Sequence, residues 1–181
     1  MKLVFLAASA ALCLLTSTAR ANPMVGGAPM YADKNIVQNA CNSKDHTTLV
    51  AAVKAAGLVD TLEGPGPFTV FAPTNEAFDA LPAGTVDNLL KPENKDQLTK
   101  VLTYHVVPGR LTGRKLMKMI DDGGGTATLK TVQGEDLTIM MNDAKDGLVL
   151  KDAQGNMANV TIKNVMQSNG VIHVVDKVLM P

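Results

Sequence analysis

The chain has 181 residues, of which 46% are hydrophobic and 19% are charged, and its 17 Lys and Arg side chains balance 17 Asp and Glu side chains, so the formal net charge is zero. This composition is typical of one soluble globular domain and argues against intrinsic disorder. It also argues against nucleic acid as a partner, because binding to the phosphate backbone requires an excess of basic side chains.

The first 21 residues have the pattern of a secretory signal peptide. Lys2 precedes an apolar run over residues 3–15, and Ala19-Arg20-Ala21 is an A-x-A cleavage site. The apolar run is shorter than the roughly 20 residues that cross a bilayer, so we expect no membrane span. We predict cleavage after Ala21, a mature chain that starts at Asn22, and a secreted or periplasmic protein.

The N-terminal half of the mature chain is predicted to be mainly helical. Residues 22–34 contain Pro and Gly without periodicity, and they form an arm that is either ordered on contact or loose. Capping residues and apolar spacing predict helices over residues 36–41 (capped by Asp33), 47–57, 74–81, 85–90 and 96–105. Between the second and third of these helices, the break at residues 64–67 precedes an apolar, β-rich strand over residues 68–72.

Cys41 is predicted to be a small buried hydrophobic residue. Cys13 leaves with the signal peptide, so Cys41 is alone and no internal disulfide is possible. Cys41 lies with Ile36, Val37 and Ala40 on the apolar stripe that a surface helix turns inward. Free cysteine is among the most buried residue types, so we expect this thiol to be unreactive in the folded protein.

The C-terminal half changes to the two-residue period of β-strands. After a short helix over residues 114–120 and the glycines at 123–125, alternating segments follow at residues 126–132, 136–141, 148–152 and 157–163. The last segment, residues 171–180, is apolar at both odd and even positions, which predicts a strand buried on both faces. Strand 68–72 is the only comparable neighbour for it. Helices first and strands last predict an α+β fold, in which a mainly β core is covered by the N-terminal helices.

Three segments resemble the signatures of the fasciclin-like domain family. They are residues 68–78 (FTVFAPTNEAF), 104–109 (YHVVPG) and 170–181 (GVIHVVDKVLMP), and their order and spacing match the family as well. The resemblance covers residues 35–181 as a single domain. It implies a wedge-shaped β-sandwich with helices packed around it, in which the first and last segments are neighbouring strands. The residues of the structural signature are Phe68, Phe71, Pro73, Thr74, Asn75 and His173.

The resemblance also implies an adhesion or interaction function. Tyr104 and His105 correspond to the interaction motif of the family, and Asn164 and Val165 correspond to an Asp-Ile pair that is implicated in integrin contact in adhesive animal members. A metal-bridged integrin contact needs a carboxylate oxygen, and the amide of Asn164 is a poorer ligand for a hard divalent cation. These four residues are therefore candidate interaction residues, but we do not carry integrin binding over.

The histidines of the signatures are also explained as core residues. His105 shares a helical face with Leu98 and Val101, and His173 alternates with Val171 and Val175 in its strand. A buried imidazole must have its nitrogens hydrogen-bonded, so we expect both rings to be satisfied inside the core.

The methionines raise the question of copper, because thioether sulfur suits Cu(I). Met117 and Met119 lie on a predicted helix, and Met140 and Met141 point to opposite faces of a strand, with no His beside either pair. Methionines that fill gaps in the core explain this pattern better, so we expect no metal and no cofactor.

The sequence contains no catalytic motif. Ser43 and Ser168 are the serines that follow the signal peptide, and neither lies in a G-x-S-x-G elbow. Residues 43–46 (SKDH) contain the letters of a catalytic triad, but neighbours in sequence at a helix start are predicted to form a turn. We therefore expect a protein that is not an enzyme.

Two functions remain. The first is an exported, non-enzymatic adhesion or interaction module that contacts matrix, a cell-surface protein or a glycan. The alternative is a carrier of an apolar small molecule, a carotenoid or a lipid, because some algal proteins of the family resemble carotenoid binders and a Met-rich wedge of sheet can open a groove.

Overall fold

The computed structural model describes residues 22–144 and 146–181. The predicted signal peptide lies outside the described residues, so cleavage after Ala21 stays a prediction. In the part of the chain that is described, no helix is both long enough and apolar enough to cross a membrane.

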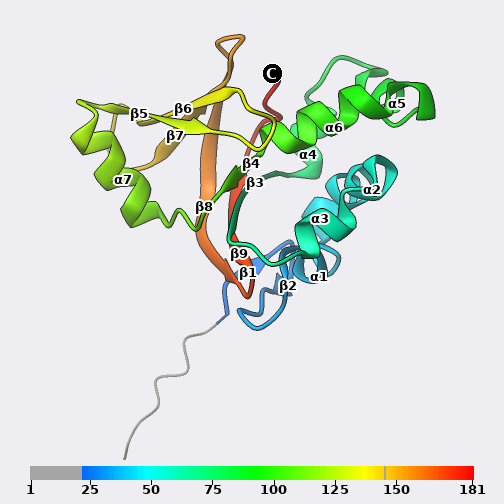
Figure 1. Ribbon diagram of the computed structural model, residues 1–181, viewed down its shortest axis with the longest axis horizontal. Coiled ribbons are helices and arrows are strands. Elements are labelled where there is room, and N and C mark those ends of the chain that lie inside the picture. The colour runs from blue at the N-terminus through cyan, green and yellow to red at the C-terminus, as the bar shows by residue number, and fades with distance from the viewer. Residues whose placement is uncertain (1–21, 145) are drawn as a thin grey trace, which may run out of the picture.

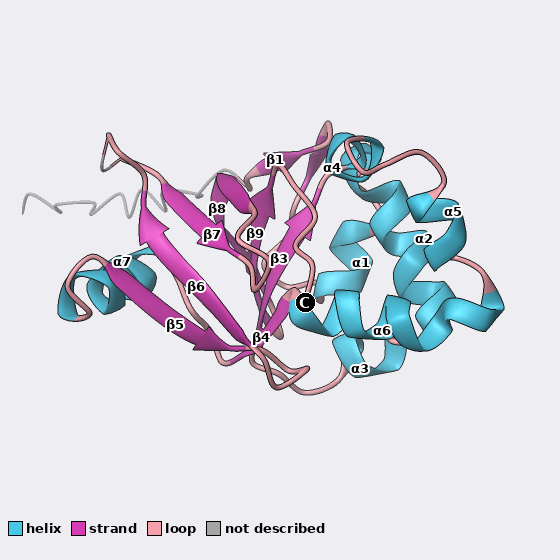
Figure 2. Cartoon of the chain, turned by 90° about the horizontal axis from the view of Figure 1, so that it is seen from above, coloured by secondary structure: helices cyan, strands magenta, loops and turns pink. Residues whose placement is uncertain are grey.

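The helices and the sheet form two sides of the molecule. Within the described residues, six α-helices gather beside one edge of the sheet, on the right of Figure 1, whereas a seventh lies at its opposite end (Figures 1 and 2). The six are α1 (Ile36–Ala40), α2 (Thr47–Ala56), α3 (Val59–Glu63), α4 (Asn75–Asp79), α5 (Thr85–Leu89) and α6 (Lys95–Tyr104), and the seventh is α7 (Gly113–Asp122). Helices and strands thus follow the predicted α+β arrangement.

The main sheet has seven strands in the order β4-β3-β9-β8-β7-β6-β5. Their bounds are β3 (Phe68–Pro73), β4 (Val106–Pro108), β5 (Thr126–Lys130), β6 (Asp136–Met141), β7 (Leu148–Lys151), β8 (Met157–Gln167) and β9 (Gly170–Val175). The amide of Val132, just beyond β5, donates to the carbonyl of Val106 in β4 over 2.8 Å. This bond brings the two outer strands together, so the sheet curls almost into a barrel.

Strands β3 and β9 are neighbours, as predicted, and they run parallel. Their register places Phe68 opposite Gly170 and Pro73 opposite Val175. Every residue of β9 is buried, which confirms the prediction of a strand covered on both faces. Strand β9 ends at Val175 rather than near Met180. The carboxylate of the next residue, Asp176, accepts hydrogen bonds from the backbone and side-chain amides of Asn159.

The core has two parts, one between the helices and the sheet and one enclosed by the curled sheet. The first contains Leu49, Val53, Leu62, Leu102 and Val174, and the second contains Phe71, Tyr104, Leu137 and Leu150 among others. Helix α7 contributes the buried Leu116 and Ile120 to the second part, against β5 and β6. Strands β3 and β9 supply side chains to both parts, which explains why they are apolar on both faces apart from the buried Thr69 and His173.

The N-terminal arm is ordered on contact. Strands β1 (Met24–Val25) and β2 (Ala28–Pro29) form a hairpin, and the side chains of Val25 and Met30 are buried in the core. The amide of Lys44 donates to the carbonyl of Gly26, which ties the hairpin to the turn before α2.

The prediction for Cys41 is wrong, because the structure exposes this residue. Helix α1 is capped by Asn35, with Gln38 completing a capping box, and it ends at Ala40, so Cys41 is the C-terminal cap. The inward position is taken instead by the polar Asn39, whose side-chain amide donates to the carbonyl of Tyr31 and to the side chain of Gln167. The polar contacts of Asn39 set the rotation of this short helix, and they turn Cys41 toward solvent.

Candidate functional site

Tyr104 and His105 lie at the C-terminal end of α6, and both are buried. The hydroxyl of Tyr104 donates to the carbonyl of Asp136 and accepts from the amide of Ala153, each over 3.1 Å, and burial raises the pKa of this phenol. These contacts connect α6 to the first residue of β6 and to the turn after β7. Tyr104 therefore has no exposed side chain for a partner to contact, and its role is to connect these elements.

The imidazole of His105 uses both of its nitrogens inside the protein. Nδ1 lies 2.8 Å from the carbonyl of Val101, and Nε2 accepts from the amide of Leu179 over 3.0 Å. An Nε2 atom that accepts is not protonated, so Nδ1 carries the hydrogen and donates it. Desolvation by burial lowers the pKa of His105 to about 4, so the ring is neutral near pH 7.

Asn164 lies in the second of two register shifts of β8 against β9, between Ile162 and Val165, and Val165 is the residue at which the pairing resumes. Val165 is fully buried, whereas Asn164 is exposed and has a φ of 65°. The Oδ1 atom of Asn164 accepts from the amide of Gly113 over 2.6 Å, at the start of α7. Of the four candidate interaction residues, Asn164 alone presents its side chain to solvent.

The signature residues join strands to helices. The rings of Phe71 and His173 stack with centroids 5.6 Å apart across β3 and β9. Thr74 caps α4, and the side chain of Asn75 bonds to Thr47, Thr48 and Lys44 near the start of α2. Phe68 is half-buried and Pro73 is buried in β3. These contacts give all six signature residues a structural part in the fold.

His173 differs from the expectation that both nitrogens are bonded. Its Nε2 atom lies 2.8 Å from the carbonyl of Leu111, but Nδ1 has no hydrogen-bond partner among the described residues. Burial lowers the pKa of this imidazole, so the ring remains neutral and no charge is buried in the core.

The pairing of Ser43 with His46 resembles that of a nucleophile and its base. A helical turn over Lys44–His46 brings Nδ1 of His46 to 2.9 Å from Oγ of Ser43. Both side chains are only 2% exposed, and the backbone of Gly26 covers the hydroxyl so closely that a Cβ there would clash with it. The arrangement leaves no room for a substrate. Within residues 22–144 and 146–181, no group of three His, Cys, Asp or Glu residues could hold a metal ion.

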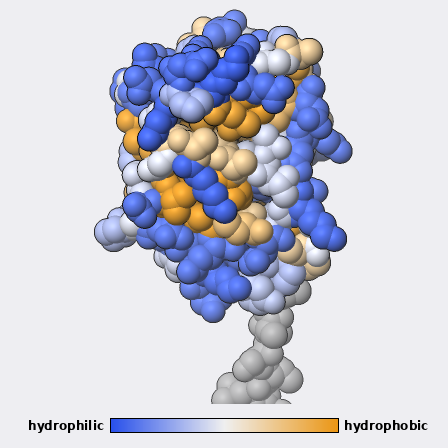
Figure 3. Space-filling model, turned by 90° about the vertical axis from the view of Figure 1, so that its right-hand side faces the viewer, coloured by the Kyte–Doolittle hydropathy of each residue, from blue (hydrophilic) through white to orange (hydrophobic). Residues whose placement is uncertain are grey.

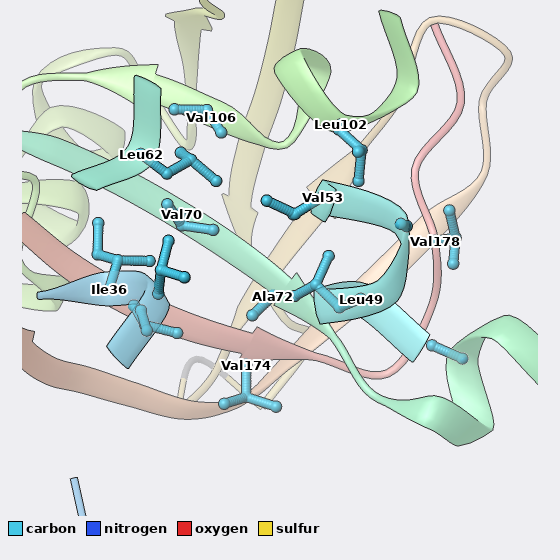
Figure 4. Close-up of a cluster of buried hydrophobic side chains, with 14 of the residues drawn as sticks. Ile36, Leu49, Val53, Leu62, Val70, Ala72, Leu102, Val106, Val174 and Val178 are labelled. Carbon is cyan, nitrogen blue, oxygen red and sulfur yellow. The ribbon is translucent and has the colours of Figure 1, made fainter. Parts of the chain in front are cut away.

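The sequence did not indicate an apolar pocket on the helical side of the molecule. Helices α1, α2, α3 and α6 surround it with β3 and β4, and it has a volume of about 50 Å³. Figure 3 faces this side and shows hydrophobic side chains gathered in the middle of a largely hydrophilic surface. Figure 4 shows Val53, Leu62 and Leu102 from the helices beside Val70 and Val106 from the strands, around the same part of the core.

The mouth of this pocket carries the residues that are only partly buried. They are Ala40, Val50, Leu58, Val59, Phe68 and Thr103, together with the exposed Lys54, Thr61 and Val132. His105, a candidate interaction residue, also lines the pocket, although it is buried. Asn164 borders a different, more polar hollow with Thr112 and Arg114, so the structure does not bring the two candidate pairs together.

Comparison with known proteins agrees with the architecture. The sequence model of the fasciclin domain matches residues 44–181. Protein sll1483 of Synechocystis sp. is 48% identical over 164 residues, which cover 91% of this chain and 83% of that protein. The cell surface glycolipoprotein MPB83 of Mycobacterium bovis is 37% identical over 161 residues, which cover 86% of this chain and 64% of that protein.

The fold is also similar to that of a FAS1 domain pair from the insect cell adhesion molecule fasciclin I. The TM-score is 0.71 at 19% identity, and the match covers 82% of this chain and 51% of the solved one. The sequence match and the shared fold lead to one conclusion: the chain belongs to the fasciclin domain family.

Proposed function

We propose that this protein is an exported, non-enzymatic interaction module that contacts a matrix component, a cell-surface protein or a glycan. The observation that carries the proposal is the apolar pocket on the helical face, whose rim of half-buried side chains is left without a covering element among the described residues. Apolar patches framed by polar residues are typical of interaction sites. The family supports the same function, since one relative is named a cell surface glycolipoprotein and a protein of similar fold is named a cell adhesion molecule.

The polar side chains inside the described part of the protein support a non-enzymatic role. Tyr104, His105 and Asn39 each form hydrogen bonds with neighbouring backbone or side-chain groups. Ser43 and His46 bond to each other beneath the N-terminal hairpin. His105 lines the apolar pocket, but both of its ring nitrogens are already hydrogen-bonded inside the protein, so neither is available to a substrate.

Attachment of protein-coated beads tests this function. Beads that carry the mature protein are applied to cells and extracellular matrix of the source organism, with heat-denatured protein on matched beads as the control. We expect attachment that free folded protein competes away. Attachment that is absent, or equal for the denatured control, would overturn the proposal. N-terminal sequencing of the exported protein should find Asn22, and a sequence that starts at Met1 would contradict export by cleavage.

The second candidate function is the transport of an apolar small molecule, and the same pocket is the candidate binding site. Its volume of about 50 Å³ is small for this purpose, since sites that enclose a drug-sized ligand usually have about 300–1,000 Å³. A carotenoid would have to separate the helices, whereas part of one alkyl chain fits. An absorbance spectrum of protein from its native source reports a pigment, and mass spectrometry of an organic extract reports a lipid. A colourless protein whose extract contains no lipid would reject this function.

A further inference from the structure

The pocket on the helical face has the dimensions of a site for one side chain. A cavity of about 50 Å³ has several times the roughly 10–15 Å³ that a single water needs. Its walls are mainly Val, Leu, Ile and Phe side chains, and the ring nitrogens of the one histidine that lines it are already hydrogen-bonded, so the space favours an apolar occupant. A branched alkyl group such as that of leucine is of the right size, whereas an extended ring system is not.

The mouth of the pocket adds one charge to this apolar interior. Among the described residues that line it, Lys54 alone is charged. It is exposed on α2, one turn after Val50, and no ion pair to it is formed within the described residues. A lysine of this kind lays its methylene stem along apolar surface and keeps its ammonium group in water. An occupant of the pocket that carries a negative charge beside its alkyl group would therefore meet the ammonium group at the rim.

Size and charge together define the partner. We infer that this pocket receives one branched apolar side chain of a partner protein, and that a carboxylate next to that side chain in the partner lies beside Lys54. The inference rests on the proposed interaction function and adds to it the place and the chemistry of the contact. Interfaces take most of their binding energy from a few side chains that enter well-packed pockets, and near-neutral contacts around them exclude water. The partly buried Val50, Leu58, Val59 and Phe68 form such a surround.

Small molecules that carry this chemistry test the site directly. The full mature protein is labelled with ¹⁵N and titrated with N-acetyl-leucine, N-acetyl-leucinamide and N-acetylalanine. We expect N-acetyl-leucine to shift amide signals of α1, α2, α3 and the end of α6. N-acetylalanine should bind at least about sixtyfold more weakly, because it lacks three of the four side-chain carbons and each buried carbon contributes about fourfold. The neutral leucinamide should bind about two- to fivefold more weakly, as expected for loss of an exposed ion pair.

Two variants and a matched control assign the binding to these residues. Val50→Phe fills the mouth and should abolish the shifts, and Lys54→Glu should reverse the preference, so that leucinamide binds better than N-acetyl-leucine. Lys151→Glu makes the same charge change on an exposed residue of β7, and it should leave both affinities unchanged. Melting temperatures of the unliganded variants confirm that each one folds.

A chain-length series separates a protein side chain from a lipid. Affinity for butanoate, hexanoate, octanoate and dodecanoate should level off at about the length of hexanoate, because the cavity holds only one short alkyl group. An increase of about fourfold per methylene out to dodecanoate would overturn the inference in favour of a lipid site. Shifts that lie elsewhere, or that Val50→Phe leaves intact, would overturn it as well.

The bead assay distinguishes failure of this inference from failure of the proposed function. If beads carrying Val50→Phe or Lys54→Glu attach as well as the wild type does, the pocket is not the contact surface, although the protein is still an interaction module. If wild-type beads do not attach but N-acetyl-leucine shifts the expected amide signals, the pocket binds a leucine side chain as inferred, and the proposed function fails.

Discussion

The amide of Leu179 donates a hydrogen bond to Nε2 of His105 over 3.0 Å, and this bond fastens the C-terminal segment to the end of α6. The other ring nitrogen bonds to the carbonyl of Val101, one helical turn earlier. The imidazole thus links a helix to a segment 74 residues away in sequence through its two hydrogen bonds. It holds only while Nε2 is free to accept, so the neutral ring is part of the folded structure.

The first prediction is that acid destabilises the protein through His105. The pKa of its imidazole is about 4 in the folded protein, against 6.5 for an unperturbed histidine such as that of the unfolded chain. The unfolded chain therefore binds a proton that the folded protein does not bind in this range. Stability is fully present above pH 6.5 and is lost as the pH falls toward 4, by about 3 kcal/mol for this group. Burial lowers the pKa of His46 and His173 too, so their contributions have the same sign.

Urea denaturation at several pH values between 7.5 and 4 measures this loss. His105→Gln is the matched variant, because glutamine offers a donor and an acceptor but does not titrate in this range. We expect the variant to be less stable at pH 7.5 and to lose less stability on acidification. A wild-type stability that stays constant from pH 7 to pH 4.5 would contradict the lowered pKa of the histidines.

The second prediction is that Val174→Asp severely destabilises the protein. Val174 is 2% exposed in β9, between the parallel β3 and the antiparallel β8. A carboxylate at this position would be buried without a partner, at a cost of several kcal/mol out of the roughly 5–15 kcal/mol that stabilise a typical domain. Thr128→Asp, on the exposed side of the outer strand β5, is the control and should cost less than about 1 kcal/mol. Similar melting temperatures for the two variants would show that β9 is not a core strand.

The sequence was sufficient to predict the pairing of β3 with β9, because an apolar pattern at both odd and even positions requires cover on both faces and only two segments have it. It was sufficient for the burial of His105 as well, since the ring lies on the apolar face of a long helix. The period of a pattern is most informative where an element is long.

Short elements and voids could not be predicted in the same way. Helix α1 has five residues, so a shift of one residue in its end decides whether Cys41 faces inward or outward. The two-residue strands of the N-terminal hairpin have too few positions to show a period. The pocket depends on how closely four helices approach β3 and β4, and its lining residues have the same pattern in sequence as a filled core.

The third prediction follows from the exposure of Cys41. An accessible thiol reacts at a rate set by its thiolate fraction, so the folded protein should react with a thiol reagent without denaturant. The measurement is the release of the coloured thiolate from a disulfide reagent at pH 8, with Cys41→Ser as the blank. We expect close to one thiol per chain of mature protein both before and after addition of urea. Reaction that begins only in urea would show that Cys41 is buried.

The last prediction concerns Asn164, whose backbone and side chain have separable effects. Its φ of 65° is in the left-handed region, which asparagine tolerates better than alanine does and which glycine adopts freely. Its Oδ1 atom also holds the first turn of α7 through the amide of Gly113. Asn164→Gly loses only the hydrogen bond, at about 1 kcal/mol. Asn164→Ala loses the bond and is also strained in this conformation, for a total of about 2–3 kcal/mol.

Urea denaturation should therefore rank the free energies of unfolding as wild type, Asn164→Gly and Asn164→Ala, in descending order. Asn164→Asp keeps the acceptor and tolerates the backbone angle, so it should unfold close to the wild type. The glycine variant then tests whether the exposed amide contacts a partner, because its fold is retained and only the amide is gone. Weaker bead attachment by Asn164→Gly, at a temperature where it is fully folded, would assign the amide to the contact. If alanine proves at least as stable as glycine, the left-handed conformation at this position is wrong.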